Sequence, residues 1–172
     1  MIRLVTLDPF EPEVVQKLSR VLFQAFGLGC EYVGDAEPPP SAVHGETLDA
    51  VRFLEAAPEV KSFADDKVVY LTGRALAGRD LPSGKGPTPG FSLYGGPSAI
   101  VTSHGLPKGD ALLKRLAKQA VHDLGHLWEL HHCLDPRCSM YAPWAPTFAN
   151  GEPVLCTFCR EKSEARIRMA KT

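Results

Sequence analysis

The sequence lacks an excess of either charge and lacks any long apolar run. Its 172 residues carry 19 Lys and Arg against 20 Asp and Glu, so the formal net charge at pH 7 is −1. Direct binding to nucleic acid depends on a basic surface that contacts phosphates, and we therefore expect none. No stretch reaches the roughly 20 apolar residues of a membrane span, and the opening residues MIRLVTLDPF do not form a signal peptide. We expect a cytoplasmic protein without a membrane partner.

Cysteine is also scarce, and its distribution is uneven. The chain has five cysteines, which is too few for the dense disulfide framework of a small secreted domain. Cys30 lies far in sequence from the others and is interpreted as a small core residue. The other four lie between residues 133 and 159, and such clustering in a protein of a reducing compartment predicts a metal site.

The residues that are present in unusual density are histidines, in the segment 122–140, HDLGHLWELHHCLDPRCSM. His122 and His126 are one helical turn apart and therefore lie on the same face of a helix. His132 follows far enough along the chain to turn back toward the same cation. Since imidazole nitrogens are good zinc ligands, these three residues predict a zinc site.

The four clustered cysteines predict a second zinc site. Cys133 and Cys138 would pair with the CTFC segment, which contributes Cys156 and Cys159. Four thiolates around one ion form a closed, structural zinc site. Because Cys133 directly follows His132, the two sites share one stretch of backbone. The prediction is two Zn²⁺ ions per chain, one bound by histidine and one by cysteine.

The same segment resembles the archaemetzincin signature, which is HExxHxxGxxH followed by Cys, then by Cx4CxM and by a later CxxC. The positions that match this signature are His122, His126, His132, Cys133, Cys138, Met140, Cys156 and Cys159. The resemblance implies a metzincin-like α/β fold, with a twisted mixed sheet and packed helices, and zinc peptidase chemistry. It also implies that Met140 packs beneath the metal-binding imidazoles and that residues 91–94 form an antiparallel edge strand above the cleft.

Asp123 is the first departure from the signature, because it replaces the glutamate. In zinc peptidases this carboxylate takes a proton from the attacking water and passes it to the leaving amine. Aspartate is one methylene shorter, which draws the carboxylate back by roughly 1.5 Å, and a misplacement of about 1 Å costs on the order of a hundredfold in rate. We therefore expect a metal-binding protein without a catalytic residue. The alternative is an active, aminopeptidase-like zinc enzyme that uses Asp123 as its general base.

Glu129 is the second departure, because it replaces a glycine that leaves the helix with positive φ. A residue with a side chain pays roughly 1–2 kcal/mol for that conformation. Zinc binding contributes on the order of 10–16 kcal/mol, so the strain is tolerable. Alternatively, the helix continues through Glu129 and His131 becomes the third ligand. We favour His132, because its spacing matches the signature.

With both departures, the segment looks most like archaemetzincin-like bacterial regulators that act with a CarD-type transcription factor. This resemblance implies a zinc-containing transcriptional regulator that is proteolytically inactive and binds a protein partner, and no single residue of the chain shows this role. The surfaces expected to receive the partner are the edge strand at residues 91–94 and the charged helix that follows Cys159.

Alternating apolar patterns predict an α/β fold with a sheet of four or five strands. Strands are expected at 2–6, 30–33, 67–71, 91–94 and 99–102, and helices from Asp8-Pro9 to residue 26, at 46–57, and from an Asp110 cap through the histidines. Irregular loops are expected at 37–41 and 73–90, with His44 and His104 outside the metal motif. Residues 1–132 would form an N-terminal subdomain and residues 133–172 a zinc-organised C-terminal subdomain, in one compact domain.

Overall fold

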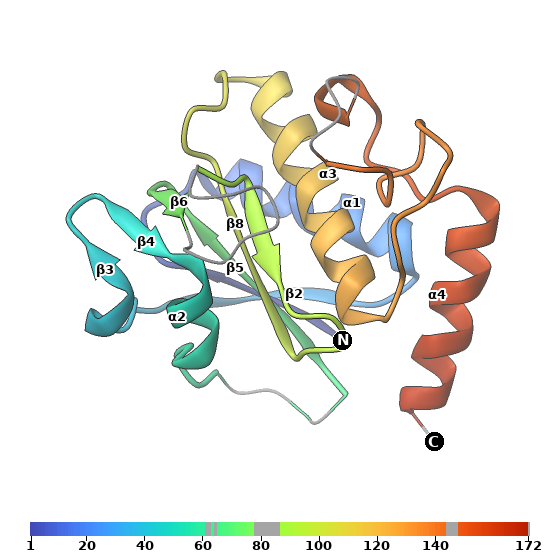
Figure 1. Ribbon diagram of the computed structural model, residues 1–172, viewed down its shortest axis with the longest axis horizontal. Coiled ribbons are helices and arrows are strands. Elements are labelled where there is room, and N and C mark those ends of the chain that lie inside the picture. The colour runs from blue at the N-terminus through green and yellow to red at the C-terminus, as the bar shows by residue number, and fades with distance from the viewer. Residues whose placement is uncertain (61–62, 64, 78–86, 144–147, 172) are drawn as a thin grey trace.

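The computed structural model describes residues 1–60, 63, 65–77, 87–143 and 148–171. The chain folds around a central sheet (Figure 1), which has five strands. The strand order is β2-β1-β5-β8-β7; all neighbours are parallel except β7, which runs antiparallel to β8 at one edge. The strands are β2 (Cys30–Asp35), β1 (Ile2–Thr6), β5 (Lys67–Thr72), β8 (Ser98–Thr102) and β7 (Gly90–Ser92). All residues of β1 and β8 are buried, as expected for parallel strands that are covered on both faces.

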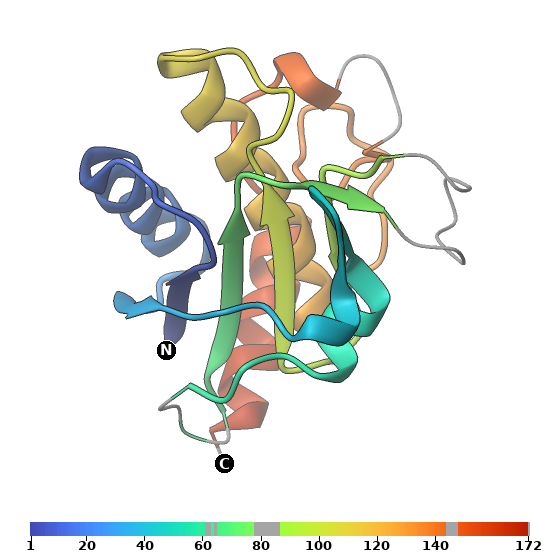
Figure 2. The same ribbon diagram turned by 90° about the vertical axis from the view of Figure 1, so that its left-hand side faces the viewer.

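Helices cover both faces of this sheet. Side chains alternate along each strand, so both faces of the sheet carry apolar residues that must be buried. Val69 and Leu71 of β5 face the core that includes α1 (Pro12–Phe26) and α3 (Asp110–Leu127). Val68 and Tyr70 of the same strand face a second core on the opposite side. Figure 2 shows the sheet between these layers. The predicted α/β fold with a twisted sheet and packed helices is confirmed.

The second core is closed by a small sheet and a short helix. The small sheet has the order β3-β4-β6, with β3 (Val43–His44), β4 (Thr47–Asp49) and β6 (Ala75–Ala77), and it is joined by the 3-10 turn η1 (Pro40–Ala42) and by α2 (Ala50–Glu55). The prediction of one helix over 46–57 is wrong in its first part. Asp49 accepts hydrogen bonds from the N–H groups of Val51 and Arg52, so the helix begins only after this cap.

Other boundaries differ from the predictions by a few residues. The first helix begins at Pro12, because Asp8 accepts hydrogen bonds from Thr72 and Gly73 and belongs to the loop. The third helix has Gly109 at its N-cap and not Asp110. The predicted loop at 73–90 contains β6, while its residues 78–86 lie outside the described part of the chain. His44 lies in β3 and is exposed, and His104 is exposed as well.

The chain beyond α3 is mostly irregular until the final helix. A short 3-10 turn, η2 (Phe148–Asn150), precedes α4 (Thr157–Ala170). Helix α4 contacts α1 and buries only one side, with Cys159, Ser163 and Ile167 turned inward. Among the described residues, no helix has the length and apolar character to cross a membrane. The predicted subdomain boundary at residue 132 stays a prediction.

Candidate metal centres

Helix α3 and the loop that follows it bring three histidines together. His122 and His126 lie one turn apart on α3, and His132 approaches from the loop. Each offers a ring nitrogen, and these nitrogens all lie within 4.8 Å of one another. The structure therefore groups the three histidines that the sequence singled out, in a shape that could hold one metal ion.

The backbone fixes which nitrogen of each helical histidine faces the centre of this group. Nδ1 of His122 lies 2.7 Å from the carbonyl oxygen of Ser139, and Nδ1 of His126 lies 2.8 Å from that of Leu130. A carbonyl only accepts, so both Nδ1 atoms donate and both Nε2 atoms keep a free lone pair. Carbonyl partners of this kind hold the tautomer and orientation of metal-binding histidines.

The Nε2 atoms of His122 and His126 lie only 3.0 Å apart. Two lone pairs at this distance repel each other unless a cation lies between them. A proton is a poor candidate, because burial lowers the pKa of His122 to about 3, with the neighbouring His126 adding to the effect. A zinc ion fits the chemistry of this group.

Glu129 turns the chain so that His132 reaches the group. Its φ is 58°, and it is the one residue other than glycine with a positive φ in the described ranges. The N–H of Leu130 then bonds to the carbonyl of Gly125 at 2.9 Å, which closes the end of the helix. The alternative in which the helix runs through Glu129 is therefore wrong.

His131, the other candidate for the third ligand, lies outside the group. Its ring stacks on Tyr94 with centroids 4.8 Å apart, and its Nε2 lies 3.1 Å from the hydroxyl of Tyr94. The structure places His132 in the metal-binding group and His131 against the segment that follows β7.

Met140 packs on the helix turn that carries the histidines. It is fully buried, and a Cβ built on Gly125 would come within 2.2 Å of its Sδ. Gly125 therefore allows the thioether to approach the backbone of α3 between His122 and His126. This contact agrees with the packing role that the resemblance implies for Met140.

Asp123 follows His122 in α3 and lies in a closed environment. It is 3% exposed; its Oδ1 accepts a hydrogen bond from Ser92 Oγ at 3.0 Å and its Oδ2 accepts one from Gln119 Nε2 at 2.8 Å. Burial raises the pKa of Asp123 to about 7, and the two hydrogen bonds oppose this rise. A Cβ on Gly90 would lie 2.3 Å from Oδ2, so only glycine fits there.

Sequence reasoning missed both residues that hold Asp123. Gln119 precedes Asp123 by one helical turn, so helix spacing could have identified it. Ser92 belongs to β7, and no local pattern connects it to α3. The carboxylate is thus oriented by one partner on its own helix and one on the edge strand.

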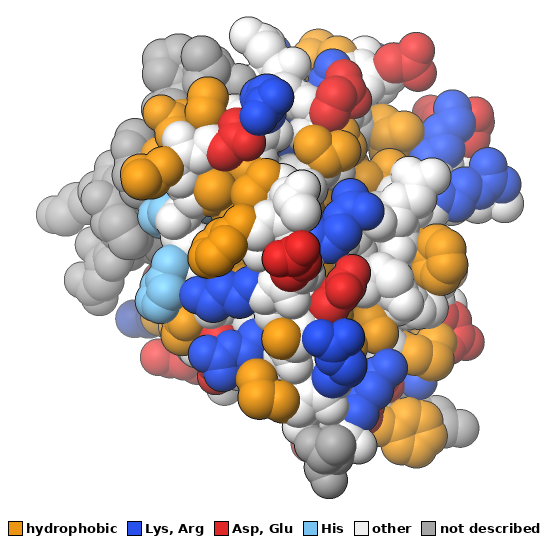
Figure 3. All heavy atoms as spheres, turned by 90° about the vertical axis from the view of Figure 1, so that its right-hand side faces the viewer, with side chains coloured by type: hydrophobic (Ala, Val, Ile, Leu, Met, Phe, Trp, Pro, Cys, Tyr) orange, Lys and Arg blue, Asp and Glu red, His pale blue; other side chains and the backbone are white. Residues whose placement is uncertain are grey.

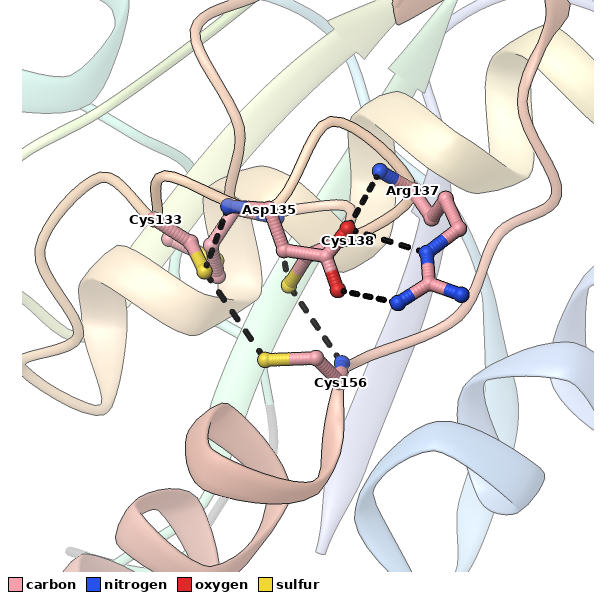
Figure 4. Close-up of polar contacts among 6 residues, drawn as sticks. Cys133, Asp135, Arg137, Cys138 and Cys156 are labelled. Carbon is pink, nitrogen blue, oxygen red and sulfur yellow. Dashed lines mark hydrogen bonds and ion pairs between the residues drawn. The ribbon is translucent and has the colours of Figure 1, made fainter.

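The four clustered cysteines also come together, at the start of α4. Figure 4 shows three of them, Cys133, Cys138 and Cys156. All four are free thiols, their sulfurs lie within 4.8 Å of one another, and Sγ of Cys133 lies 3.8 Å from Sγ of Cys156. The sulfur of Cys138 accepts hydrogen bonds from the N–H groups of Met140 and Cys156, each at 3.4 Å. Burial raises the pKa of Cys138 to about 11, and these two hydrogen bonds oppose the rise by favouring the thiolate that zinc requires.

The loop between Cys133 and Cys138 is braced by its own residues. The N–H of Asp135 donates to the sulfur of Cys133 at 3.4 Å, and Asp135 Oδ1 accepts hydrogen bonds from the backbone and side chain of Arg137, as Figure 4 shows. The N–H of Cys133 donates to the carbonyl of Met140 at 2.8 Å. Residues 132–140 therefore link the histidine group to the cysteine group.

Known proteins that resemble this chain are archaemetzincins. No protein-family model matches it. The archaemetzincin of Natronomonas pharaonis is 26% identical over 149 residues, which cover 77% of this chain and 83% of that protein. The archaemetzincin of Pyrobaculum aerophilum is 37% identical over 60 residues, or 31% of this chain and 35% of that protein.

Solved structures show the same fold. The archaemetzincin of Methanopyrus kandleri has a TM-score of 0.81 at 23% identity, with coverage of 97% of this chain and 94% of that one. A zinc-dependent peptidase from Methanocorpusculum labreanum has a TM-score of 0.78 at 21% identity, with coverage of 95% and 100%. The archaemetzincin of Archaeoglobus fulgidus, complexed with malonate, has a TM-score of 0.75 at 18% identity, with coverage of 94% and 99%.

The chain is similar to archaemetzincins in sequence and shares the fold of solved archaemetzincins. Its histidine group could hold a metal ion. Zinc is supported by these relatives and by the two groups of possible ligands. The number of ions, two, stays a prediction.

Proposed function

We propose that this chain is a zinc-dependent peptidase in which His122, His126 and His132 hold the metal. The observation that carries the proposal is the distance of 3.0 Å between the Nε2 atoms of His122 and His126. A backbone carbonyl binds the Nδ1 atom of each ring, and the imidazole of His132 completes the group. Three protein ligands leave a fourth position for water or substrate, which is the arrangement of catalytic zinc sites. One structural relative is itself described as a zinc-dependent peptidase.

Asp123 is the general base in this proposal. Zinc supplies an acidified water and polarises the scissile carbonyl when it is bound. Asp123 accepts the proton of the attacking water and returns it to the leaving amine. Ser92 and Gln119 hold the carboxylate in one orientation, and the free lone pairs of its two oxygens accept the further hydrogen bond.

Strand β7 provides a place for the peptide backbone. It is the edge strand of the main sheet and runs antiparallel to β8, as the archaemetzincin resemblance implies. Its Ser92 already contacts Asp123, so a peptide added along this edge would lie next to the base. Addition of a strand to an open edge is a recurring way to bind extended peptides.

The test is cleavage of a mixture of short peptides by purified, zinc-loaded protein. Removal of zinc by a chelator should abolish cleavage, and added zinc should restore it. His126→Ala should remove the activity, whereas the control His131→Ala should retain it, because His131 lies outside the metal group. Absence of cleavage in the wild type, or equal loss in both variants, would contradict the proposal.

A second candidate is a regulator without peptidase activity, comparable to CarG, which works with the transcription factor CarD. The observation in its favour is that Asp123 is one methylene short and that each of its oxygens already has a hydrogen-bond partner. In this role the histidine group is structural and the chain acts through a DNA-binding partner. The net charge of −1 also fits an indirect route to DNA.

The surface of α4 is one place where such a partner could bind. Figure 3 shows basic, acidic and hydrophobic side chains mixed on this face, and no stripe of a single charge crosses its described part. Phe158 and Met169 of α4 are 69% and 59% exposed. Co-elution of the chain with a purified CarD-type regulator, combined with absent peptidase activity, would support the second candidate. Retardation of DNA by the chain alone would argue against it.

A further inference from the structure

Lys118 of α3 is buried, and none of the described residues forms a hydrogen bond with its side chain. Its side chain is fully buried, and its Nζ is one of the buried polar atoms that have no partner within the described residues. The ring centroid of Phe148 lies 4.8 Å from Nζ, and a Cβ built on Gly151 would lie 2.0 Å from it. The charges of Cys138 and Glu152 act on Lys118, but neither residue forms a hydrogen bond with its Nζ in the described part of the chain. A buried ammonium that no described carboxylate hydrogen-bonds is costly, and an anionic ligand would offset that cost.

This lysine lies next to the histidine group. Lys118 precedes His122 by one helical turn, so both project from the same face of α3. The ring of Phe148 contacts both residues, since its centroid is 5.6 Å from that of His122. A group bound by Lys118 would therefore lie within reach of a substrate at the metal site.

A small cavity opens beside Lys118. Its volume is about 120 Å³, and its walls include Lys118, Arg115, Gln119 and Phe148. Arg115 is half-buried and forms no ion pair among the residues that the structure describes. Among the described residues, the lining thus contains two cationic side chains and no carboxylate. A cavity of this size has room for several waters, and therefore for a carboxylate group.

Gln119 adds an acceptor to the same wall. Its Nε2 donates to Asp123, while its Oε1 is buried and has no partner in the described part of the chain. The cavity therefore offers unpartnered donors and one unpartnered acceptor side by side. A C-terminal residue of a peptide has the complementary groups, which are a carboxylate and the N–H that precedes it.

We propose that this cavity binds the C-terminal carboxylate of a short peptide substrate. Lys118 and Arg115 donate to the carboxylate, and Gln119 accepts the preceding N–H. That the bound peptide is a substrate rests on the proposed peptidase function, whereas the binding of a carboxylate in this cavity does not. The same Gln119 joins the cavity to Asp123, so occupation of the site places the terminal peptide bonds near the base.

The experiment compares two ligands that differ only at the C-terminus, acetyl-Ala-Ala and acetyl-Ala-Ala-amide. Dissociation constants are measured by calorimetry on the zinc-loaded chain. Because a charged hydrogen bond contributes about 1.5–3 kcal/mol and 1.4 kcal/mol is tenfold, the acid should bind at least about tenfold more tightly than the amide. A third ligand, acetyl-Ala-Asp-amide, tests an acidic side chain, and its binding as tightly as the acid would overturn the assignment to the C-terminus.

Three variants show where the carboxylate binds. Arg115→Met and Lys118→Met should each reduce the preference for the acid to about twofold or less. Lys114→Met is the matched control, because it removes one charge from the same helix while Lys114 pairs with Glu152 and does not line the cavity. An equal loss in Lys114→Met, or an unchanged preference in Arg115→Met, would overturn the proposal. If Lys118→Met fails to fold, Arg115→Met decides, since its side chain is only half-buried.

Cleavage and zinc content are measured on the same preparations. Selective binding of the acid without any cleavage would leave the carboxylate site standing and contradict the peptidase function. Cleavage without a preference for the acid would support the peptidase function and overturn the carboxylate site. Loss of zinc in Lys118→Met with an unchanged preference for the acid would show that Lys118 only balances the charge of the metal sites, and would overturn the proposal.

Discussion

The carboxylate of Glu129 lies 2.9 Å from Nη1 of Arg166, so an ion pair joins the residue just beyond the metal-binding helix to α4. Glu129 is also the residue that carries the positive φ of 58°. Both side chains are about two-fifths exposed, and an exposed pair of this kind contributes at most about 1 kcal/mol. The turn therefore combines backbone strain with a weak tie to the last helix.

Replacement of Glu129 should show this strain directly. Glu129→Gly loses the ion pair but relieves roughly 1–2 kcal/mol of strain, so its free energy of unfolding should stay close to that of the wild type. Glu129→Ala loses the same pair and keeps the strain, and it should be less stable than Glu129→Gly by about 1 kcal/mol. Urea unfolding of zinc-loaded proteins measures both. Equal stability of the two variants would show that the strain is negligible.

Metal analysis should find two zinc ions per chain. His126→Ala and Cys138→Ser should each retain one, because the two groups bind metal separately. Cys138→Ser should unfold more readily, since the thiolate group fastens α4 to the loop after α3, whereas α3 forms without its ion. A single zinc in the wild type, with thiols that react freely with a thiol reagent, would contradict this prediction.

The pH dependence of stability should reveal the burial of Asp123. Its folded pKa of about 7 lies above the ordinary value of 3.8, so the native state holds a proton that the unfolded chain releases. The stability that this provides is complete below pH 3.8 and is lost as pH rises through 7. In metal-free protein, the free energy of unfolding of Asp123→Asn minus that of the wild type should therefore increase between pH 4 and 7, by at most about 4 kcal/mol. A constant gap over this range would refute the burial effect.

A longer side chain at position 123 should restore the reach of the base. Asp123→Glu extends the carboxylate by about 1.5 Å, and kcat for peptide hydrolysis should rise, by up to roughly a hundredfold. Zinc content must stay unchanged for the comparison to hold. An unchanged or lower kcat would mean that Ser92, Gln119 and Gly90 fit the site to aspartate.

The metal groups could be predicted from the sequence because their spacing is local. His122 and His126 are neighbours on any helix, and the positive φ of Glu129 was expected from the glycine that the archaemetzincin signature has at this position. Strands β1 and β5 were predictable as well, since their apolar residues are buried on both faces. In these cases, the residue pattern within a short stretch of sequence is sufficient to predict the local structure.

The remaining features depend on partners distant in the chain. Residues 47–49 resemble the start of a helix, but they pair with β6 as strand β4. Ser92 approaches Asp123 only because β7 lies beside α3. Lys118 is covered by Phe148 and Gly151, which lie about 30 residues further along the chain. No local pattern encodes contacts of this kind.

The most direct test of the account is the rate of zinc-dependent peptide hydrolysis by the wild type beside Asp123→Asn. Asparagine has nearly the same shape and can still accept a hydrogen bond from Ser92 or Gln119, but it cannot act as a base. The account predicts hydrolysis by the wild type that requires zinc and falls at least about a hundredfold in Asp123→Asn, at equal zinc content. Equal rates in the two proteins, or no hydrolysis by the wild type, would contradict it.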